Sequence, residues 1–347
     1  MSLFPKFQEQ TTHAKYTAQA LGTTISIPIK REKHLESVMV FVSGTVTTNA
    51  ATGNADGILN VLRKVTLTAG GRDYVNGVSG AALIELDAME NGEVDYLTKY
   101  GIAAGSTITT TAFNSGAAFD LCYPINCVQP QIQEVAGNVL MIPMPGFNED
   151  GTLTLQLATQ AEMDTNASAT FAMTGGVTIE VIFNWRQAPV GTNGLPHAIW
   201  GIDESEVVYS AGQEDKFDFA ALGSYTGLLV RGYTSVSARG DFTSAGTMLD
   251  LRFGSTSLRK AKFTKLAREN ERSKTSLQGY FLNSPFFDFL TDGKGQVFGV
   301  NSVLDANPSA AGGTRFSLNY TTGGAYRVKF VTRRIYGDLT PLKQLPK

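Results

Sequence analysis

GTLTLQLAT (151–159) followed by GGVTIEVIFNWR (175–186) returns in outline as GTRFSLNYTT (313–322) followed by GGAYRVKFVTRR (323–334). Each copy opens with Gly-Thr, alternates apolar and polar residues, turns at Gly-Gly and then alternates again toward Phe and Arg. Alternation with a period of two predicts β-strands that bury one face. We therefore expect two related β units in tandem.

The same order continues toward the beginning of each half, where three further pairs of stretches correspond. The pairs are ISIPI (25–29) with DKFDFA (215–220), ESVMVFVSGTVT (36–47) with YTGLLVRGYTSVS (225–237), and GILNVLRKVTLT (57–68) with GTMLDLRFGSTSL (246–258). A unit of roughly 150–180 residues is too long for one repeat of a solenoid and has the size of a complete β-sandwich. The prediction is a duplicated β-sandwich.

Helical periodicity is limited to two short stretches, 80–100 and 261–273, which follow the early strands of each half. About eight strands per unit with such an insert suit a jelly roll. The predicted fold class is all-β: two tandem eight-stranded jelly-roll β-barrels with short helical inserts. Segment 101–150 is turn-rich and forms either an elaborated loop or additional strands, with VLMIPM (139–144) as a candidate strand.

Turn-forming residues predict a linker between the two barrels. RQAPVGTNGLPHAIW (186–200) contains Pro189 and Pro196, and we expect the flanking Trp185 and Trp200 to pack the barrels together. The predicted boundaries are an N-terminal arm at 1–22, a first barrel at 23–188, a linker at 189–200, a second barrel at 201–340 and a C-terminal tail at 341–347.

Composition narrows the class of protein. Only 17% of the 347 residues are charged and the formal net charge is −2, so no specific nucleic-acid binding is expected. A polar, weakly charged surface is typical of a protein that is buried against neighbouring copies. The beginning of the chain lacks the apolar stretch of a secretion signal, and no run approaches the ~18 apolar residues of a membrane span. We expect synthesis and folding in a cytoplasm.

Catalytic motifs are missing from the sequence. The three histidines, His13, His34 and His197, lie in separate regions, so the two metal sites of a bicupin cannot be assembled from them. The chain has neither a Gly-x-Ser-x-Gly elbow nor a P-loop, and its carboxylates cannot be paired from sequence. We expect no enzyme, no catalytic residues and no cofactor-binding residues.

Metal ligands are equally sparse. Cys122 and Cys127 have no second cysteine pair beside them, which favours two free thiols or a local disulfide over a zinc site. The acidic segment around Asp203–Glu206 and FNEDG (147–151) leave a structural calcium site open. An Asx-type turn explains the second segment equally well.

One longer stretch resembles a known family. HLESVMVFVSGTVTT (34–48) together with GILNVLRKVTLTAGGRDYVNGVSGAALIEL (57–86) resembles the first barrel of the double jelly-roll major capsid proteins of membrane-containing icosahedral phages of the PRD1, PM2 and FLiP type. In that family a strand ending near Ser-Gly precedes an Ile/Leu-rich strand that leads into a loop and helix. The resemblance covers most of residues 20–340 as architecture and strand order.

The resemblance implies a major capsid protein located in the virion. Homotrimers would form pseudo-hexagonal capsomers that tile an icosahedral shell over an internal lipid membrane. The partners would be further copies of the chain, penton or minor capsid proteins, and the membrane. The alternative function is a carbohydrate-binding or adhesin-like β-sandwich, for which Tyr and Phe are plentiful but only two Trp are present.

Two surface segments are candidates for contacts. The N-terminal arm is either a strap that reaches a neighbour or the membrane, or a locally packed terminus; its apolar contact residues would be Phe4, Phe7 and Tyr16. The basic stretch at 258–272 either faces membrane or genome, or forms a solvated helix face with local acids. Its cations are Arg259, Lys260, Lys262, Lys265 and Arg268.

Overall fold

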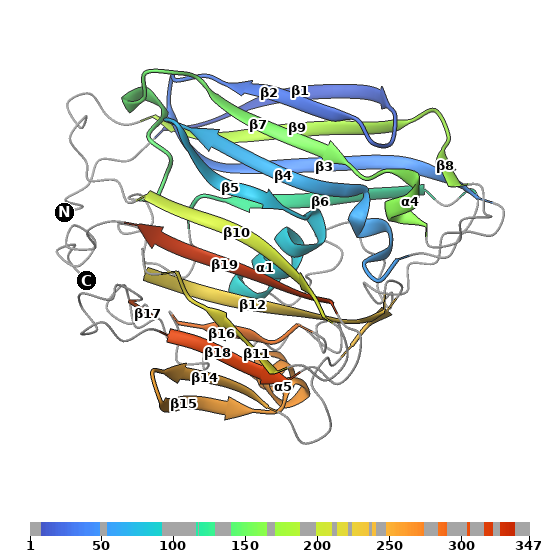
Figure 1. Ribbon diagram of the computed structural model, residues 1–347. Helices are drawn as coiled ribbons and strands as arrows, with labels where there is room; N and C mark the ends of the chain where they lie inside the picture. The colour runs from blue at the N-terminus through green and yellow to red at the C-terminus, as the bar shows by residue number, and fades with distance from the viewer. Residues whose placement is uncertain are drawn as a thin grey trace.

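The computed structural model describes the strands and the principal helices of the chain. The described residues are 8–48, 54–91, 116, 118–128, 140–164, 171–187, 199–209, 214–220, 224–235, 238–240, 248–273, 284–289, 304–305, 316–321 and 327–336. Together they form two β-sandwiches stacked one above the other (Figure 1).

The first sandwich consists of two sheets that face each other. One sheet has the order β1 (Gln8–Gln19), β9 (Val177–Gln187), β3 (His34–Thr48) and β6 (Ala118–Asn126), and β8 (Phe171–Met173) pairs with the end of β3. The facing sheet has the order β2 (Thr24–Ile29), β7 (Gly151–Leu157), β4 (Leu62–Ala69) and β5 (Arg72–Val78). Because apolar residues alternate along these strands, each sheet contributes every second side chain to one shared core.

The second sandwich has a smaller core. One sheet contains β10 (Ile199–Val208), β19 (Arg327–Tyr336) and β12 (Ser224–Ser235), with the short strands β13 (Ala238–Arg239), β16 (Phe286–Asp288) and β17 (Leu304–Asp305) paired to β12. The facing sheet has the order β11 (Glu214–Asp218), β18 (Phe316–Thr321), β14 (Leu249–Phe253) and β15 (Thr256–Ala261). Aromatic residues such as Phe219, Phe263 and Phe330 fill the space between them.

The strand order is the same in both sandwiches. The order β2-β7-β4-β5 of the first sandwich corresponds to β11-β18-β14-β15 of the second, and β1-β9-β3-β6 corresponds to β10-β19-β12-β16. The stretches that match in sequence occupy matching strands, which confirms the predicted duplication. The two units are joined where β5 pairs with β10, so one sheet of each sandwich belongs to a continuous ten-stranded sheet.

The helices are short. Among the described residues they are η1 (Gly57–Val61), α1 (Gly80–Asn91), η2 (Met144–Gly146), α4 (Gln160–Met163) and α5 (Phe263–Ser273). The predicted helices are confirmed over 80–91 and 263–273, and residues 92–100 lie outside the described part. Within the described residues, no helix has the length and apolar character needed to cross a membrane.

The predicted N-terminal arm is wrong for residues 8–19. These residues form β1, which pairs antiparallel with β9 along its length. The stretch reads as polar because β1 is an edge strand with few buried side chains. Tyr16 packs half-buried against the first core, whereas Phe4 and Phe7 lie outside the described residues.

Segment 101–150 contains a strand that the sequence did not reveal. Residues Ala118–Asn126 form β6 at the edge of its sheet, where Pro124 is tolerated because an edge strand leaves some N–H positions unpaired. The candidate strand at 139–144 is wrong for its described residues: 140–144 make only an isolated bridge from Ile142 to Leu35. Of the predicted linker, residues 199–200 already belong to β10. The tail at 341–347 lies outside the described part.

Candidate functional site: the junction between the sandwiches

A short parallel seam connects the two sandwiches. Ile202 pairs with Val75 and Asp203 with Asn76, whose side-chain amide donates to Asp203 Oδ1 over 3.3 Å. Beyond Asp203 the two strands share no further register. So short a ladder cannot fix the orientation of two sandwiches, and the junction depends on side chains.

Trp200 packs at one end of the short pairing between β5 and β10. Its indole is buried, contacts Tyr74 edge-to-face with 5.2 Å between ring centroids, and donates from Nε1 to the Leu140 carbonyl over 2.7 Å. The prediction that Trp200 packs the sandwiches together is therefore confirmed. It is wrong for Trp185, which lies on β9 within the first sandwich and donates to Thr12 of β1.

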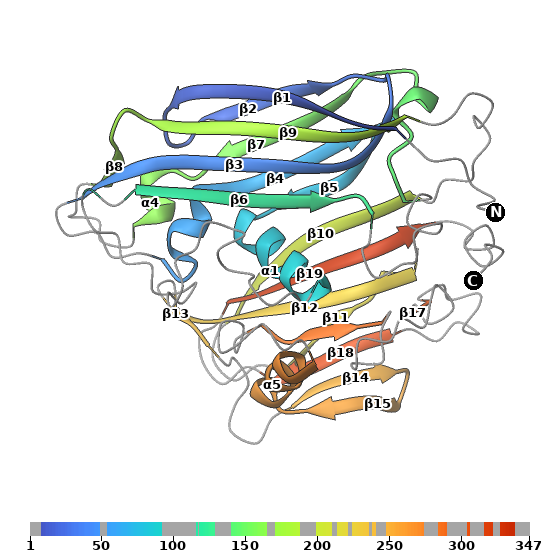
Figure 2. The same cartoon turned by 180° about the vertical axis from the view of Figure 1, so that it is seen from behind.

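Helix α1 fills the space beside the seam (Figure 2). Every described side chain from Gly80 to Glu90 is buried, so the helix has no solvent face. Its first residue must be glycine, because a Cβ at Gly80 would lie 2.5 Å from the Tyr123 ring and 2.8 Å from the Leu62 carbonyl oxygen. Its apolar residues join the first core, and its acidic residues meet cations of the second sandwich.

Arg231 of β12 is the centre of a buried ion network. Its side chain is 0% exposed, and its guanidinium donates from Nε and NH2 to both oxygens of Glu85 on α1, each over 3.2 Å. The same group donates to Asp56 Oδ1 over 3.0 Å and to the Ser79 hydroxyl over 3.2 Å. Asp56, Ser79 and Glu85 belong to the first sandwich, so one arginine ties three of its segments to the second.

Arg239 of β13 binds two of the carboxylates that Arg231 binds. Its guanidinium donates to Asp56 over 2.9 Å and to Glu85 over 2.8 Å, and the Tyr233 hydroxyl donates to the other oxygen of Asp56 over 2.9 Å. On the second sandwich, Glu204 lies 3.0 Å from Lys329 and accepts from the backbone N–H of Ser79 over 2.6 Å. Three carboxylates thus face three cations: Asp56, Glu85 and Glu204 against Arg231, Arg239 and Lys329.

A second ion pair lies at the far end of α1. Arg333 of β19 donates to Glu90 over 2.6 Å and to the backbone carbonyls of Asn126 and Cys127 over 3.0 and 3.3 Å. Its guanidinium also stacks over the Trp200 ring, 5.4 Å from the ring centroid. This arginine holds α1, β6 and β10 to one strand of the second sandwich.

The network stays ionised because its charges compensate each other. Burial raises the pKa of Asp56, but Arg231, Arg239 and Lys329 outweigh that effect and hold it well below its usual range. The same balance of burial against the two arginines lowers the pKa of Glu85 to about 2. Removing one partner from such a buried cluster leaves an uncompensated charge, which typically costs about 3–5 kcal/mol. The junction therefore fixes one arrangement of the sandwiches.

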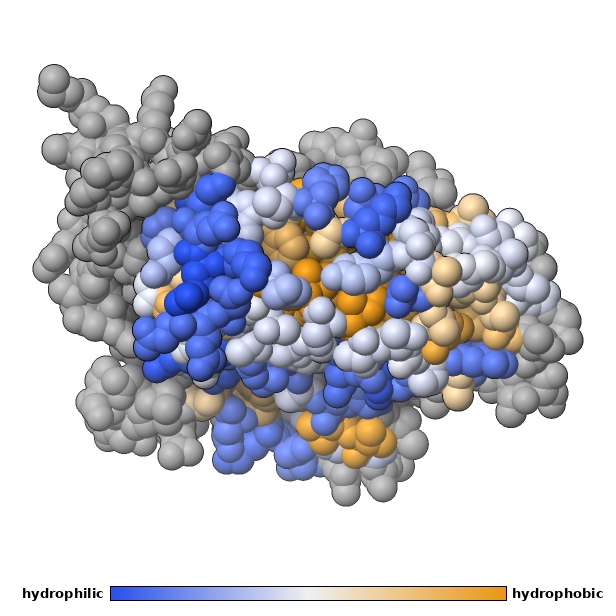
Figure 3. All heavy atoms as spheres, turned by 90° about the horizontal axis from the view of Figure 1, so that it is seen from above, coloured by the Kyte–Doolittle hydropathy of each residue, from blue (hydrophilic) through white to orange (hydrophobic). Residues whose placement is uncertain are grey.

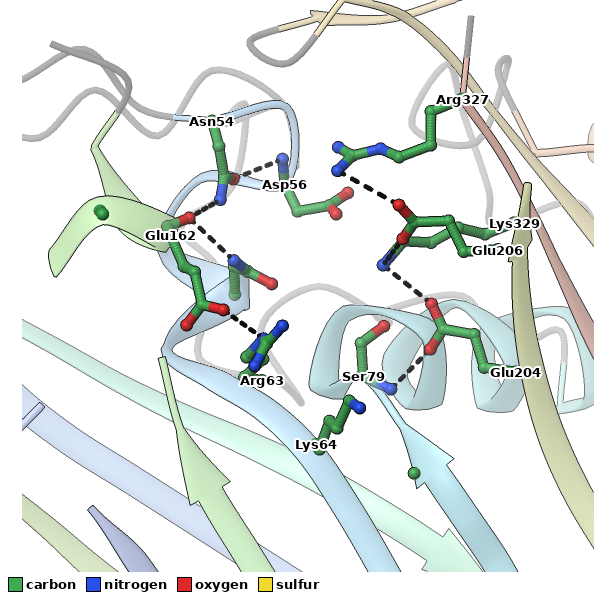
Figure 4. A pocket seen from close by; sticks show the side chains of 13 residues that line it. Asn54, Asp56, Arg63, Lys64, Ser79, Glu162, Glu204, Glu206, Arg327 and Lys329 are labelled. Carbon is green, nitrogen blue, oxygen red and sulfur yellow. Dashed lines mark hydrogen bonds and ion pairs between the residues drawn. The ribbon is translucent and has the colours of Figure 1, made fainter. Parts of the chain in front are cut away.

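A cavity of about 600 Å³ opens beside the network (Figure 4). Residues from the two sandwiches face each other across it, and their charges are paired locally. Arg63 lies 2.6 Å from Glu162 on the first sandwich, and Glu206 lies 3.4 Å from Lys329 on the second. The lining residues are Asn54, Asp56, Asn60, Arg63, Lys64, Gly77, Ser79, Ala161, Glu162, Glu204, Glu206, Arg327 and Lys329.

The acidic segments that left a calcium site open lie against cations. Asp203 accepts from Arg334, and Glu204 and Glu206 both contact Lys329. In the other segment, Asp150 lies 3.0 Å from Lys30. Within the described ranges, no group of three or more His, Cys, Asp or Glu side chains is arranged to hold a metal ion.

The cysteines and the basic stretch lie apart from the junction network. Cys122 on β6 and Cys127 just after it are buried and are not joined by a disulfide, in agreement with the first of the two sequence alternatives. The cations of the basic stretch are all exposed on β15, on α5 and between them, and Arg259 pairs with Glu269. Those cations are Arg259, Lys260, Lys262, Lys265 and Arg268.

The junction residues were missed by sequence reasoning, although a signal existed. Charged residues in strands are usually solvent-exposed, so the sequence did not predict that Arg231 and Arg333 are buried. However, Arg231 interrupts the apolar run LLVRGY (228–233), and the acids of α1 interrupt an apolar helix with no polar face. A charge inside an otherwise apolar element indicates a buried ion pair.

Comparison with known proteins identifies the fold. No family model and no curated protein sequence matches this chain. Among solved structures, the major capsid protein of Sulfolobus turreted icosahedral virus superimposes with a TM-score of 0.69 and 14% identity, over 98% of this chain and 100% of that one. The PBCV-1 virus capsid protein gives 0.66 and 11%, over 96% and 95%. The major capsid protein P2 of bacteriophage PM2 gives 0.55 and 10%, over 95% and 97%.

These similarities extend over both sandwiches. Each covers at least 95% of this chain, so the likeness includes the relative placement of the two units. The chain therefore has the double jelly-roll fold of these viral capsid proteins, as the sequence predicted.

Proposed function

We propose that this chain is the major capsid protein of an icosahedral virus and that its role is structural. The observation that carries the proposal is a duplicated jelly roll whose two units are locked by a buried ion network. A shell subunit must present its two units in a fixed relation, and the network around Arg231 and Glu85 supplies that rigidity. The role requires neither a catalytic residue nor a cofactor.

In this proposal three copies close into a homotrimer. Three chains of two similar units give six units around one axis, so the trimer is a pseudo-hexagonal tile that packs among identical tiles. Penton or minor capsid proteins would occupy the vertices, and a lipid membrane would lie inside the shell. The likeness to capsid proteins does not favour the carbohydrate-binding alternative.

The test is the solution mass of the purified full chain, measured by light scattering at moderate salt. The expected result is three times the 37.2 kDa of one chain, or larger assemblies built from such trimers. Electron microscopy of the same sample should show tiles with six similar lobes. A monomer at high concentration would contradict the proposal, and saturable binding on a glycan array would support the alternative.

A further inference from the structure

The cavity beside the ion network brings charged residues of both sandwiches to one place. The face seen from above differs: apolar residues lie near its centre, and the hydrophilic residues around them are open to solvent (Figure 3). The cavity measures about 600 Å³, which is the size of a site for a small ligand. Its charged lining residues are the cations Arg63, Lys64, Arg327 and Lys329 and the acids Asp56, Glu162, Glu204 and Glu206.

The carboxylates of the cavity already have partners for their oxygens. Glu162 contacts Arg63 through one oxygen over 2.6 Å and accepts two hydrogen bonds of 2.9 Å at the other from the N-cap residue of α4. Glu206 places its two oxygens 3.8 and 3.4 Å from cations of β19. Asp56 and Glu204 are held by the buried ion network. A metal ion would have to displace these partners, so the acids do not favour a cation as ligand.

The cations, in contrast, keep donors that no protein group uses. Within the described residues, the ammonium group of Lys64 makes neither an ion pair nor a hydrogen bond. Arg63 contacts its acid through Nε alone, which leaves both terminal nitrogens to donate elsewhere. Arg327 lies over the Tyr233 ring, 4.5 Å from its centroid, and its nearest carboxylate oxygen is 3.8 Å away, beyond hydrogen-bond reach.

The balance of charge around the cavity also favours an anion. Apart from Lys64, each cation that lines the cavity or lies directly behind it has a carboxylate to compensate it. The compensated groups are Arg63 with Glu162, Arg327 with Glu206, Lys329 with Glu204, and Arg231 and Arg239 with Asp56 and Glu85. Lys64 has no such counterpart in the described part of the chain, so one positive charge is left in excess.

A β-bulge explains why two consecutive cations of β4 reach the same cavity. Successive side chains of a regular strand point to opposite faces. In β4, however, Leu62 pairs with Leu157 and Lys64 with Gln156, so Arg63 is one residue more than β7 has to pair with it. Such a bulge redirects a side chain. Arg63 and Lys64 therefore both line the cavity.

The donors stand on two different sandwiches. Arg63 belongs to β4 of the first sandwich and Arg327 to β19 of the second, and the two lie on opposite sides of the cavity, with Lys64 below them (Figure 4). An arginine offers N–H groups in a planar fork that matches the oxygens of a carboxylate or a phosphate, and a lysine adds a point charge. The three side chains thus suit a group with several negatively charged oxygens.

We propose that this cavity binds a small oxoanion, a phosphate or carboxylate group of a soluble ligand, between Lys64 and Arg63 of the first sandwich and Arg327 of the second. Because the donors come from both sandwiches, the bound anion forms a second bridge across the junction, next to the buried network. The site lies within one chain and does not depend on how many chains assemble.

Isothermal titration calorimetry of the full chain in a chloride buffer tests the site. Inorganic phosphate is the probe for a phosphoryl group, and citrate is the probe for carboxylates. We expect saturable binding of at least one probe. Lys64→Gln removes the uncompensated charge and should weaken that binding at least about tenfold. Arg327→Gln removes the donor on the opposite sandwich and should weaken it to a similar extent.

Thermal unfolding provides a second readout. The probe that binds should raise the unfolding midpoint of the wild type, because it binds the folded chain and not the unfolded one. Lys64→Gln should lose this rise. Since Lys64 is exposed, its substitution should leave the midpoint without the anion unchanged, which separates lost binding from lost folding.

Lys260→Gln is the matched control for the change in charge. Lys260 is exposed on β15, does not line the cavity and, like Lys64, makes no ion pair among the described residues. Its substitution should leave the affinity for the probe and the rise of the midpoint as they are in the wild type. An equal loss of binding in Lys260→Gln and Lys64→Gln would show a general charge effect and overturn the site.

The two probes distinguish the sources of the anion. Binding of phosphate alone assigns the site to a phosphoryl group, and binding of citrate alone assigns it to carboxylates. Binding of neither probe, or binding that Lys64→Gln leaves unchanged, would overturn the site. Binding that depends on Lys64 but not on Arg327 would overturn the bridge between the sandwiches. The mass of the assembly is measured separately, so a failure here leaves the proposed function standing.

Discussion

Helices α1 and α5 follow corresponding strands in the two sandwiches, yet only α1 is buried on every side. Helix α1 lies between the sandwiches, and its acids meet arginines of the second. Helix α5 buries one face in its own core and leaves its cations exposed. The difference shows that corresponding helices of a duplicated unit can have different surroundings: the helix of the first sandwich is buried at the junction, and the helix of the second lies at the surface.

The edge strands show the same division. Strand β10 pairs with β19 on one side and with β5 on the other, whereas its counterpart β1 pairs with β9 alone among the described strands. In the part of the chain that the structure describes, β5 and β10 thus pair with each other, whereas β1 and β15 each have one unpaired side. An unpaired edge strand is a site at which another chain can pair. The β5–β10 junction therefore bears on the stability of the monomer, and the edges at β1 and β15 bear on its assembly.

The largest expected effect is on stability, when a residue of the buried ion network between the sandwiches is substituted. Arg231→Met leaves Asp56 and Glu85 buried without their shared cation and should lower the free energy of unfolding by about 3–5 kcal/mol. Lys265→Met at the exposed α5 should change it by less than about 0.5 kcal/mol. Urea unfolding followed by near-ultraviolet circular dichroism measures both. Equal effects of the two substitutions would contradict the buried role of Arg231.

Acid should weaken the internal junction. The pKa of Glu85 falls from 4.5 to about 2 in the folded chain, so its contribution is complete above pH 4.5 and is lost as the pH falls toward about 2. A lowering of this size corresponds to about 3 kcal/mol. Unfolding curves between pH 6 and pH 2 should show this loss, and Glu85→Gln should flatten it. A dependence that Glu85→Gln leaves unchanged would assign the loss to other carboxylates.

The close approach at the start of α1 gives a smaller effect. Gly80→Ala places a methyl group 2.5 Å from the Tyr123 ring and should cost about 1–3 kcal/mol through overpacking. Gly146→Ala is the matched control, since nothing lies within 4 Å of the Cβ that it adds. Thermal unfolding of both variants checks the difference. Indistinguishable midpoints would show that α1 can shift away from β6 and is not fixed at the junction.

The smallest expected effect is the loss of stability when either tryptophan loses its indole hydrogen bond. Trp200→Phe removes the bond to the buried Leu140 carbonyl and should cost about 1–2 kcal/mol. Trp185→Phe removes a bond to the hydroxyl of Thr12, an exposed residue at which water can replace the indole N–H, and should cost less. Limited proteolysis between the sandwiches should accelerate for Trp200→Phe only. Acceleration for both variants would contradict the assignment of Trp200 to the junction and Trp185 to the first sandwich.

The strands that alternate apolar and polar residues were predictable, and the junction was not. Strands β2, β7 and β9 bury every second residue, so their period is visible in the sequence. Strand β6 buries five consecutive residues and contains a proline, and β1 buries few residues, so neither shows that period.

The candidate site depends on partners far apart in the chain. Arg231 and Glu85 are separated by 146 residues, and sequence gives no sign that they meet. The signal that existed was indirect: a charge inside an apolar strand and acids in an apolar helix. Duplication itself was readable from the order of strands, which is why the fold class was predictable while the residues that lock its two units were not.

The central claim is that the buried ion network around Arg231 and Glu85 fixes the two sandwiches of one chain in a single arrangement. Electron cryo-microscopy of the assembled wild-type protein tests it most directly. The account predicts trimers with six similar lobes, in which α1 lies buried between the two sandwiches of every chain and Glu85 contacts Arg231. Chains whose two sandwiches adopt more than one relative orientation, or in which α1 lies away from the junction, would contradict it.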